Sequence, residues 1–256
     1  FQTFESRPAG DEDQAGQGGG GFGGFGGFGG GRPSTSAGSN RFSWNMRYPG
    51  YTDFEGRIFW AAGNQGPAAL PGTYTVRMTV DGTAYEQDFE VRMNPRAASE
   101  GVTMADLQAR FDFAMQIRDQ VSAANEAVIR IRRIKEQIDA RQEESGNAEL
   151  QSLGDQVETK LGAVEQEVYQ VRNQSNQDPL NFPIKLNNKI AALLGVVEGA
   201  ESRPTDQSMD VYQKLTGELD TQLELLTIII QQDVAQLNEL LRELGLDPIQ
   251  TENLIT

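Results

Sequence analysis

Apolar residues recur every three or four positions through most of the chain beyond residue 100, which is the spacing of one face of an α-helix. The first such stripe follows Thr103-Met104-Ala105-Asp106, which resembles a capping box with Asp in place of the usual Glu or Gln. It lasts about nine turns, roughly 50 Å. Its members are Leu107, Phe111, Ala114, Ile117, Val121, Ala124, Val128, Ile131, Ile134 and Ile138.

Three further stripes follow, each separated from the last by a short break. One break contains Glu143-Glu144-Ser145-Gly146-Asn147, and another contains two prolines four positions apart, Pro179 and Pro183, which leave no room for continuous helix. The short connections favour an antiparallel bundle of three long helices and one short one, with a two-chain coiled coil as the alternative. The later stripes occupy residues 150–171, 184–199 and 206–244.

Before residue 100 the apolar period changes from helical spacing to alternation, which is typical of β-strands. Phe42, Trp44 and Met46 share one face of a first predicted strand, and residues 57–60 form a second short apolar run. Asp81-Gly82 is a hairpin turn signal of type I′. The strands on either side of that turn place Tyr74, Val76, Met78 and Val80 on the same face as Tyr85, Phe89 and Val91.

These patterns together predict an α+β protein of two domains. Residues 1–96 are expected to form a small antiparallel β-sandwich of the immunoglobulin or fibronectin type III kind, because five or six short strands alternate with turns. Residues 97–256 are expected to form the antiparallel helical bundle. The chain opens on Phe1-Gln2-Thr3-Phe4-Glu5, which reads like the middle of a strand and suggests that further sequence lies upstream.

Residues 9–39 form a glycine-rich insertion in the predicted sandwich, with a Gly-Gly-Phe unit repeated at Phe22, Phe25 and Phe28. Such a tract is expected to be a flexible loop, because ordering many glycines costs more entropy than the tract itself can offset. The alternative is that the three phenylalanines are anchors that dock on a partner protein. They are the only partner-binding residues that the sequence suggests.

The composition contains 37 acidic and 22 basic residues, no histidine and no cysteine, with a net charge of -15. Such acidity disfavours binding to nucleic acid or to anionic lipid. The absence of histidine and cysteine removes the commonest general base, metal ligand and thiol nucleophile, so we expect no metal, no cofactor and no small-molecule substrate. No apolar run is long enough to span a membrane.

The remaining candidates for chemistry are carboxylates and tryptophans. The pairs Glu165 with Glu167 and Asp206 with Asp210 are interpreted as solvated positions on amphipathic helices. Trp44 and Trp60 are expected to pack in the sandwich core, and the alternative is that they line a sugar-binding face. No catalytic residue is predicted, and the chain is not expected to be an enzyme.

Three stretches of the chain have distinctive motifs. They are residues 40–49, from Asn40-Arg41-Phe42 to Tyr48-Pro49; residues 66–82, with Gly66-Pro67 and Pro71-Gly72-Thr73-Tyr74; and residues 178–190, with Asp178-Pro179-Leu180-Asn181-Phe182-Pro183, followed by Arg203-Pro204-Thr205-Asp206-Gln207. Together they resemble the C-terminal region of bacterial sortilin-like propeller proteins with Asp-box (BNR) repeats, which are often described as glycosyl-hydrolase-like. The resemblance implies an extracytoplasmic location and a propeller upstream, in which any hydrolase-like site would lie.

The sequence thus favours a non-catalytic accessory or scaffolding module that acts by protein–protein contact. We expect it to be a periplasmic or extracellular bacterial subunit in a larger assembly, peripheral to a membrane complex such as a photosynthetic reaction centre. The alternative is a fragment of a carbohydrate-active or peptidase-like propeller enzyme whose active site lies outside this chain. A plain linker between a propeller and the cell envelope differs from the first hypothesis only in lacking a defined partner.

Overall fold

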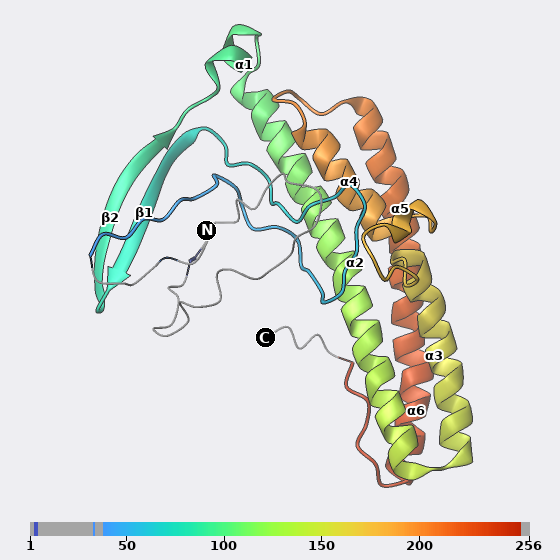
Figure 1. Ribbon diagram of the computed structural model, residues 1–256. Helices are drawn as coiled ribbons and strands as arrows, with labels where there is room; N and C mark the ends of the chain where they lie inside the picture. The colour runs from blue at the N-terminus through green and yellow to red at the C-terminus, as the bar shows by residue number, and fades with distance from the viewer. Residues whose placement is uncertain (1–2, 5–32, 34–37, 252–256) are drawn as a thin grey trace.

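The computed structural model describes residues 3–4, 33 and 38–251 of the chain. They form a long helical rod, with a two-stranded hairpin that stands away from one end of it (Figure 1). None of the helices in the described part combines the length and the apolarity needed to cross a membrane.

The rod consists of three antiparallel layers of helix. The longest helix, α2, runs the full length of the rod and packs against α3 along one part and against α4 along the other (Figure 1). The third layer is one nearly continuous helix that folds back along the others. The bounds are α2 Met104–Ser145, α3 Ala148–Val168, α4 Leu186–Glu198, α5 Asp206–Ile229, the π-helical turn η3 Ile230–Val234 and α6 Ala235–Glu243.

The predicted helix boundaries depend on local capping chemistry, and the structure places them accordingly. Thr103 and Asp106 form a complete capping box at the start of α2. Gly146 ends α2 in the left-handed conformation, at φ 60°, which glycine adopts without steric cost. Asn147 then caps α3 by accepting hydrogen bonds from the amides of Glu149 and Leu150.

The middle layer is broken by residues 169–185, which include the short 3-10 helix η2 (Asp178–Leu180). The Gln170 side chain donates to the carbonyl of Pro183 at 2.9 Å and holds the two ends of this connection together. The prediction of an antiparallel bundle is therefore partly right. Its second and third helices, however, lie end to end and share one layer.

The π-helical turn η3 shifts the register of the third layer by one residue. Leu219 and Leu226 are buried seven positions apart, and the same repeat would bring Asp233 into the core. The wider turn buries Val234 instead. Asp233 stays at the surface, where its carboxylate accepts from Lys160 Nζ at 2.7 Å. A single helix thus keeps its apolar stripe against the rod through both halves.

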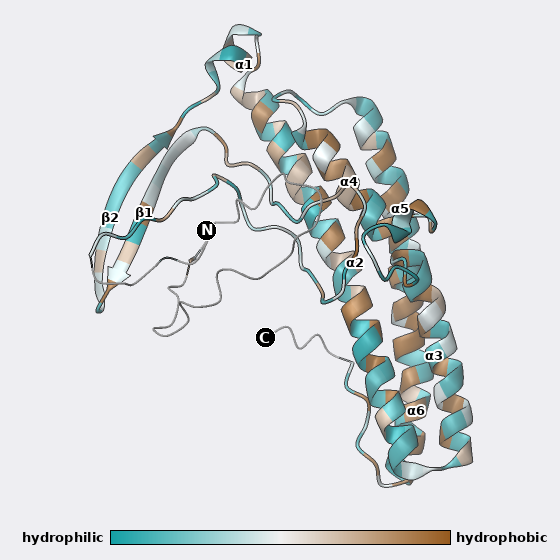
Figure 2. Ribbon diagram, in the orientation of Figure 1, coloured by the Kyte–Doolittle hydropathy of each residue, from teal (hydrophilic) through white to brown (hydrophobic). Residues whose placement is uncertain are grey.

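The core of the molecule lies between the three helical layers, where the apolar stripes face one another (Figure 2). Nine of the ten residues predicted for the α2 stripe are buried, and Phe111 is half-buried. The stripe of α3 is buried as far as Val168, where the helix ends, except that Leu153 is half-buried, and Val171 is exposed. The burial of large aliphatic side chains along the rod accounts for its cohesion.

The predicted immunoglobulin-like or fibronectin-like sandwich is wrong. Among the described residues the one sheet is an antiparallel pair, β1 (Gly72–Val80) with β2 (Thr83–Val91). Asp81 and Gly82 join the two strands with φ angles of 47° and 78°, as a type I′ turn requires. The short helix α1 (Pro95–Ser99) connects the hairpin to α2.

The other predicted strands are irregular because their backbones turn away from extended geometry. Met46 and Ala61 have positive φ angles of 56° and 51°, which interrupt both apolar runs. One isolated bridge, between Arg47 and Ala68, is the only ladder contact that these segments make among the described residues. Phe42 and Met46 are exposed rather than packed in a sandwich core.

Candidate functional site

Residues 47–69, which we call the strap, lie along the helical rod rather than in a sheet. The strap closes on itself, since Tyr48 N donates to Pro67 O at 2.9 Å. Gly66 is buried at this closure, and a Cβ atom there would lie 2.0 Å from the carbonyl oxygen of Tyr48. The closed loop therefore requires glycine at this position.

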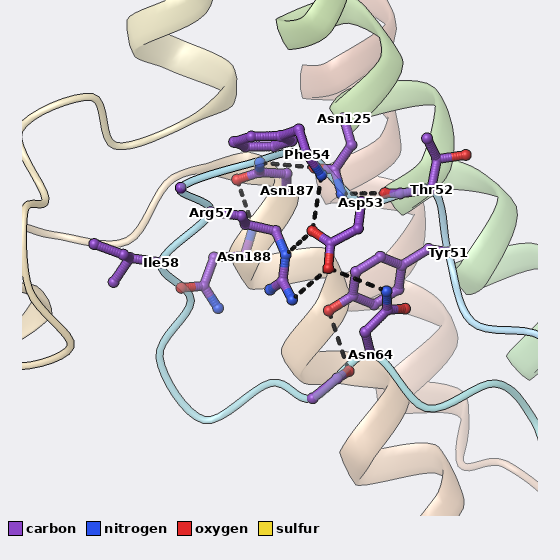
Figure 3. A network of polar contacts seen from close by, with 12 residues as sticks. Tyr51, Thr52, Asp53, Phe54, Arg57, Ile58, Asn64, Asn125, Asn187 and Asn188 are labelled. Atoms are coloured by element: carbon purple, nitrogen blue, oxygen red, sulfur yellow. Dashed lines mark hydrogen bonds and ion pairs between the residues drawn. The ribbon is translucent and has the colours of Figure 1, made fainter. Parts of the chain in front are cut away.

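Three buried asparagines fasten the strap to the bundle (Figure 3). Asn187 on α4 donates to Asn125 Oδ1 on α2 at 3.0 Å. Asn125 in turn donates to the carbonyl of Thr52 at 2.7 Å. Asn188 receives the amide of Trp60 at 2.7 Å and donates to the carbonyl of the same residue at 2.8 Å, so its side chain takes the place of a neighbouring strand.

Apolar and ionic contacts also attach the strap to the helical rod. Tyr51 is buried in the core of the rod, and the ring of Phe54 meets that of Tyr169 edge-on at 5.0 Å. At the C-terminal end of α4, the Glu198 carboxylate forms an ion pair with Arg47. The strap thus contacts α2, α4 and Tyr169, the residue that follows α3, and it belongs physically to the bundle.

Burial and electrostatic contacts shift the pKa values of two strap residues, Tyr51 and Asp53. Burial raises the pKa of Tyr51 to about 12, and its hydroxyl donates to the carbonyl of Gly63 at 3.1 Å. Burial would also raise the pKa of Asp53, but hydrogen bonds from Arg57 and Asn64 and the Arg57 charge outweigh that effect and lower it. Asp53 is therefore an anion at neutral pH, bound to the Arg57 guanidinium.

The asparagine network is best understood as structural. The side-chain oxygen and nitrogen of each of the three asparagines are already bonded within the protein, so a ligand would have to displace an existing bond. Breaking such a buried bond leaves an unsatisfied group at considerable cost. The network fixes the position of the strap. Because the strap connects to the hairpin, the network also fixes the position of the base of the hairpin.

The hairpin presents a different kind of surface, which we call the apolar face. Every second residue of β1 and β2 points to one side, and no charged residue occupies that side. Val76, Met78, Val80 and Tyr85 are 53%, 58%, 46% and 56% exposed. Isolated singly, such residues would be unremarkable, but here they form one contiguous patch.

The base of the apolar face is covered by the segment before the strap. The Trp44 ring lies 5.6 Å from the ring of Tyr74 and 6.1 Å from that of Phe89. The Trp44 indole also donates to the carbonyl of Arg47 at 3.1 Å. These contacts link the hairpin to the strap and leave the distal half of the face open.

The opposite face of the hairpin, which we call the polar face, carries its charges. Glu86, Asp88 and Glu90 follow one another at alternate positions along β2. Glu86 pairs with Arg77 at 2.6 Å, and Asp88 accepts from the Thr75 hydroxyl at 2.6 Å. These contacts are solvent-exposed, so they contribute little to stability. The hairpin is thus amphipathic across its thickness.

Of the residues singled out from the sequence, the phenylalanines Phe22, Phe25 and Phe28 lie outside the described residues. The expected burial of both tryptophans in a sandwich core is wrong, because Trp44 is half-buried and Trp60 is 41% exposed. No group of three or more acidic side chains within the described segments is arranged to hold a metal ion.

Three of the four carboxylates of the predicted pairs have separate roles. The interpretation of Glu165 as a solvated position is wrong, because Glu165 is buried and forms ion pairs with Arg132 at 2.8 Å and Lys135 at 3.1 Å. Glu167 pairs with Lys185 at 3.1 Å on the surface. Asp206 opens α5, where a carboxylate interacts favourably with the positive end of the helix.

The asparagine network escaped the sequence interpretation. Asn187 and Asn188 are adjacent at the start of a mostly aliphatic helix, and Asn125 interrupts the stripe of α2 between Ala124 and Val128. Polar residues placed on an apolar face are the available signal, since buried amides require partners. What those partners are depends on the path of the strap, which the local pattern does not contain.

No protein-family model, curated protein or solved structure matches this chain. The resemblance to the propeller proteins therefore stays a prediction.

Proposed function

We propose that the chain is a non-catalytic accessory module of a larger assembly, which it joins by protein–protein contact through the apolar face of the hairpin. The observation that carries the proposal is the open distal half of that face, with Val76, Met78, Val80 and Tyr85 exposed together. An isolated two-stranded hairpin is marginally stable in water. A covering surface would stabilise it and remove its apolar side chains from solvent.

The composition of the face fits the core of a protein interface. It combines tyrosine, phenylalanine and methionine with valine and two uncharged polar residues, Thr83 and Gln87, and it has no charged side chain. Aromatic residues and methionine are enriched at the centres of such interfaces, and charged residues are depleted there. The rigid rod and the asparagine-fastened strap would hold this face at a fixed position. The extracytoplasmic location belongs to the same proposal and is supported only by the propeller-protein resemblance.

The partner is a different protein rather than a second copy of this chain. Nine residues per strand at about 3.3 Å each, on two strands, give a face of about 300 Å². Any partner that covered this face alone would bury about 600 Å² in total, roughly half of what a stable interface needs, so the partner must also contact surface beyond the face. Two copies of this chain would each bring a net charge of -15, which opposes self-association.

Site-specific photo-cross-linking in the native host tests this proposal. A photoreactive amino acid at Met78, on the apolar face, is expected to give a discrete adduct with one other protein. The same group at Thr79, the next residue on the polar face, is the matched control and is expected to give none. An absence of adducts from Met78, equal adducts from both positions, or adducts only with a second copy would contradict the proposal.

A further inference from the structure

The outward backbone groups of the hairpin suggest how a partner would attach, if the proposed function holds. In a hairpin closed by a two-residue turn, alternate residue pairs direct their amides and carbonyls away from the partner strand. With Val80 opposite Thr83, the outward residues of β2 are Ala84, Glu86, Asp88 and Glu90. Within the described residues one of these backbone groups has a partner, the Asp88 carbonyl, which accepts from Gln87 Nε2 at 3.0 Å. The others form no hydrogen bond there.

We propose that β2 accepts an extended segment of the partner protein as a third strand of the sheet. Strand addition of this kind satisfies a row of unpaired backbone groups and obtains specificity from alternate side chains. The segment we infer alternates basic and apolar residues. Its apolar side chains would extend the apolar face beside Tyr85 and Phe89, and its lysines or arginines would lie on the polar face beside Glu86, Asp88 and Glu90.

Charge distinguishes β2 from β1 as the acceptor. The outward residues of β1 are Thr73, Thr75, Arg77 and Thr79, so that edge carries one positive charge and no negative one. The β2 edge carries three carboxylates in a row at every second position. Opposite charges on directly adjacent strands stabilise the pairing, and like charges destabilise it. A lysine-bearing strand is therefore favoured at β2 and disfavoured at β1.

The position of β2 in the molecule also favours addition there. In Figure 1, β2 forms the edge of the hairpin that is farther from the helical rod, and β1 lies on the side nearer to it. The acidic row also explains how the edge avoids pairing with other copies of this chain. Charged edge residues are a common means of preventing strand addition by identical molecules.

A peptide-binding experiment with the full chain tests the inference. The probe is a short peptide of alternating valine and lysine, and the control is a peptide of the same composition with the valines and lysines in two blocks. Binding is measured by amide chemical shifts. The alternating peptide is expected to shift the amides of Ala84, Glu86, Asp88 and Glu90 more than those of Thr73, Thr75, Arg77 and Thr79, and the block peptide is not.

Proline substitutions supply a matched pair of variants, because Asp88 and Thr75 face each other and both direct their amides outward. Asp88→Pro removes an outward donor without removing a backbone hydrogen bond between β1 and β2. The side-chain bond between Thr75 and Asp88 is lost in both variants, so it does not distinguish them. We expect it to weaken peptide binding by roughly tenfold or more, since both the donor and the close approach of the added strand are lost. Thr75→Pro is expected to change binding by less than about twofold. Asp88→Asn, which keeps the amide, measures the effect of the charge alone.

The outcomes separate this inference from the proposed function. Equal effects of Asp88→Pro and Thr75→Pro, or equal binding of the block peptide, would show charge attraction without strand addition and would overturn the inference. Should Asp88→Pro disturb the hairpin, the distribution of shifts in the unmodified chain still decides between the two edges. If the Met78 adduct persists while the alternating peptide fails to bind, the apolar face docks a partner by another mode. In that case the function stands and the strand addition is wrong.

Discussion

The helical bundle and the hairpin are both amphipathic, and they differ in what covers their apolar side chains. Ile131 on α2 is fully buried because α2 is enclosed by α3, α4 and the third helical layer. Met78 on β1 also has a large apolar side chain within a regular apolar pattern, but it is 58% exposed. The helices of the bundle therefore cover one another's apolar surfaces. In the hairpin, no described residue covers the distal half of the apolar face.

This difference assigns the two regions different roles. A region whose apolar surface is enclosed contributes stability, whereas a region with an open apolar face contributes contact surface. The strap connects the two, since its asparagine contacts belong to the bundle and Arg47 joins the Trp44 segment at the base of the hairpin. The comparison leads to predictions that separate stability from association.

The largest expected effect comes from opening a cavity in the bundle. Ile131→Ala removes a fully buried side chain from α2 and should lower the free energy of unfolding by about 2–5 kcal/mol. Urea denaturation followed by the helical circular dichroism signal measures this change. Val211→Ala is a control on α5, where the side chain is exposed. A loss below about 1 kcal/mol for Ile131→Ala would show that the helices do not pack as described.

A smaller effect is expected from disturbing the closure of the strap. Gly66→Ala places a Cβ atom against the carbonyl oxygens of Tyr48 and Pro49. Because backbone atoms must shift to make room, we expect a loss of about 1–3 kcal/mol in the free energy of unfolding. Gly63→Ala is the matched control in the same strap, since its Cβ would meet no atom within 4 Å. Equal stability of the two variants would contradict the closed path of the strap.

The strap also predicts a dependence of stability on alkaline pH. Burial raises the pKa of Tyr51 from 10.0 to about 12, so folding favours the neutral phenol. Its contribution is complete below pH 10 and is lost as the pH rises from about 10 to 12. Tyr51→Phe should reduce the slope of stability against pH in this window and cost about 1 kcal/mol at neutral pH through the lost hydrogen bond to Gly63.

Tyr74 and Tyr212 also have a raised pKa, so the parent chain rather than a flat baseline is the reference for this measurement. Chemical denaturation at a series of pH values compares the two proteins. If the slopes of the parent and Tyr51→Phe are the same above pH 10, the Tyr51 hydroxyl ionises without opposing folding, and its burial in the core of the rod is not as described.

The bundle was more predictable from sequence than the β region for a physical reason. A helix stripe such as Leu107 to Ile138 and a cap such as Thr103 with Asp106 are local, so neighbours in the chain determine them. The pairing of strands is not local. Phe42, Trp44 and Met46 alternate as a strand should, but the positive φ of Met46 and the packing of the strap on the bundle take that segment out of any sheet.

The same reasoning applies to the site residues. The alternation of Tyr74, Val76 and Met78 predicted the apolar face. It did not predict that the face is exposed, because alternation identifies a face without identifying what covers it. Predicting the asparagine network would have required knowing that Thr52 packs against α2 and that Trp60 packs against α4. Contacts between residues 70 or more positions apart depend on the path of the whole chain.

The smallest expected effect on stability is on the hairpin, and it decides the comparison between the two regions. Val76→Thr keeps a β-branched side chain on the apolar face and makes it polar. Because Val76 is more than half exposed, we expect the free energy of unfolding to change by no more than about 0.5 kcal/mol. Association with the partner should nevertheless weaken, since a hydroxyl would then have to be removed from water. Urea denaturation and the yield of the Met78 cross-link measure the two quantities in the same protein. A large loss of stability with an unchanged cross-link yield would mean that the face is covered within the chain itself, and the contrast between an enclosed bundle and an open hairpin would then be wrong.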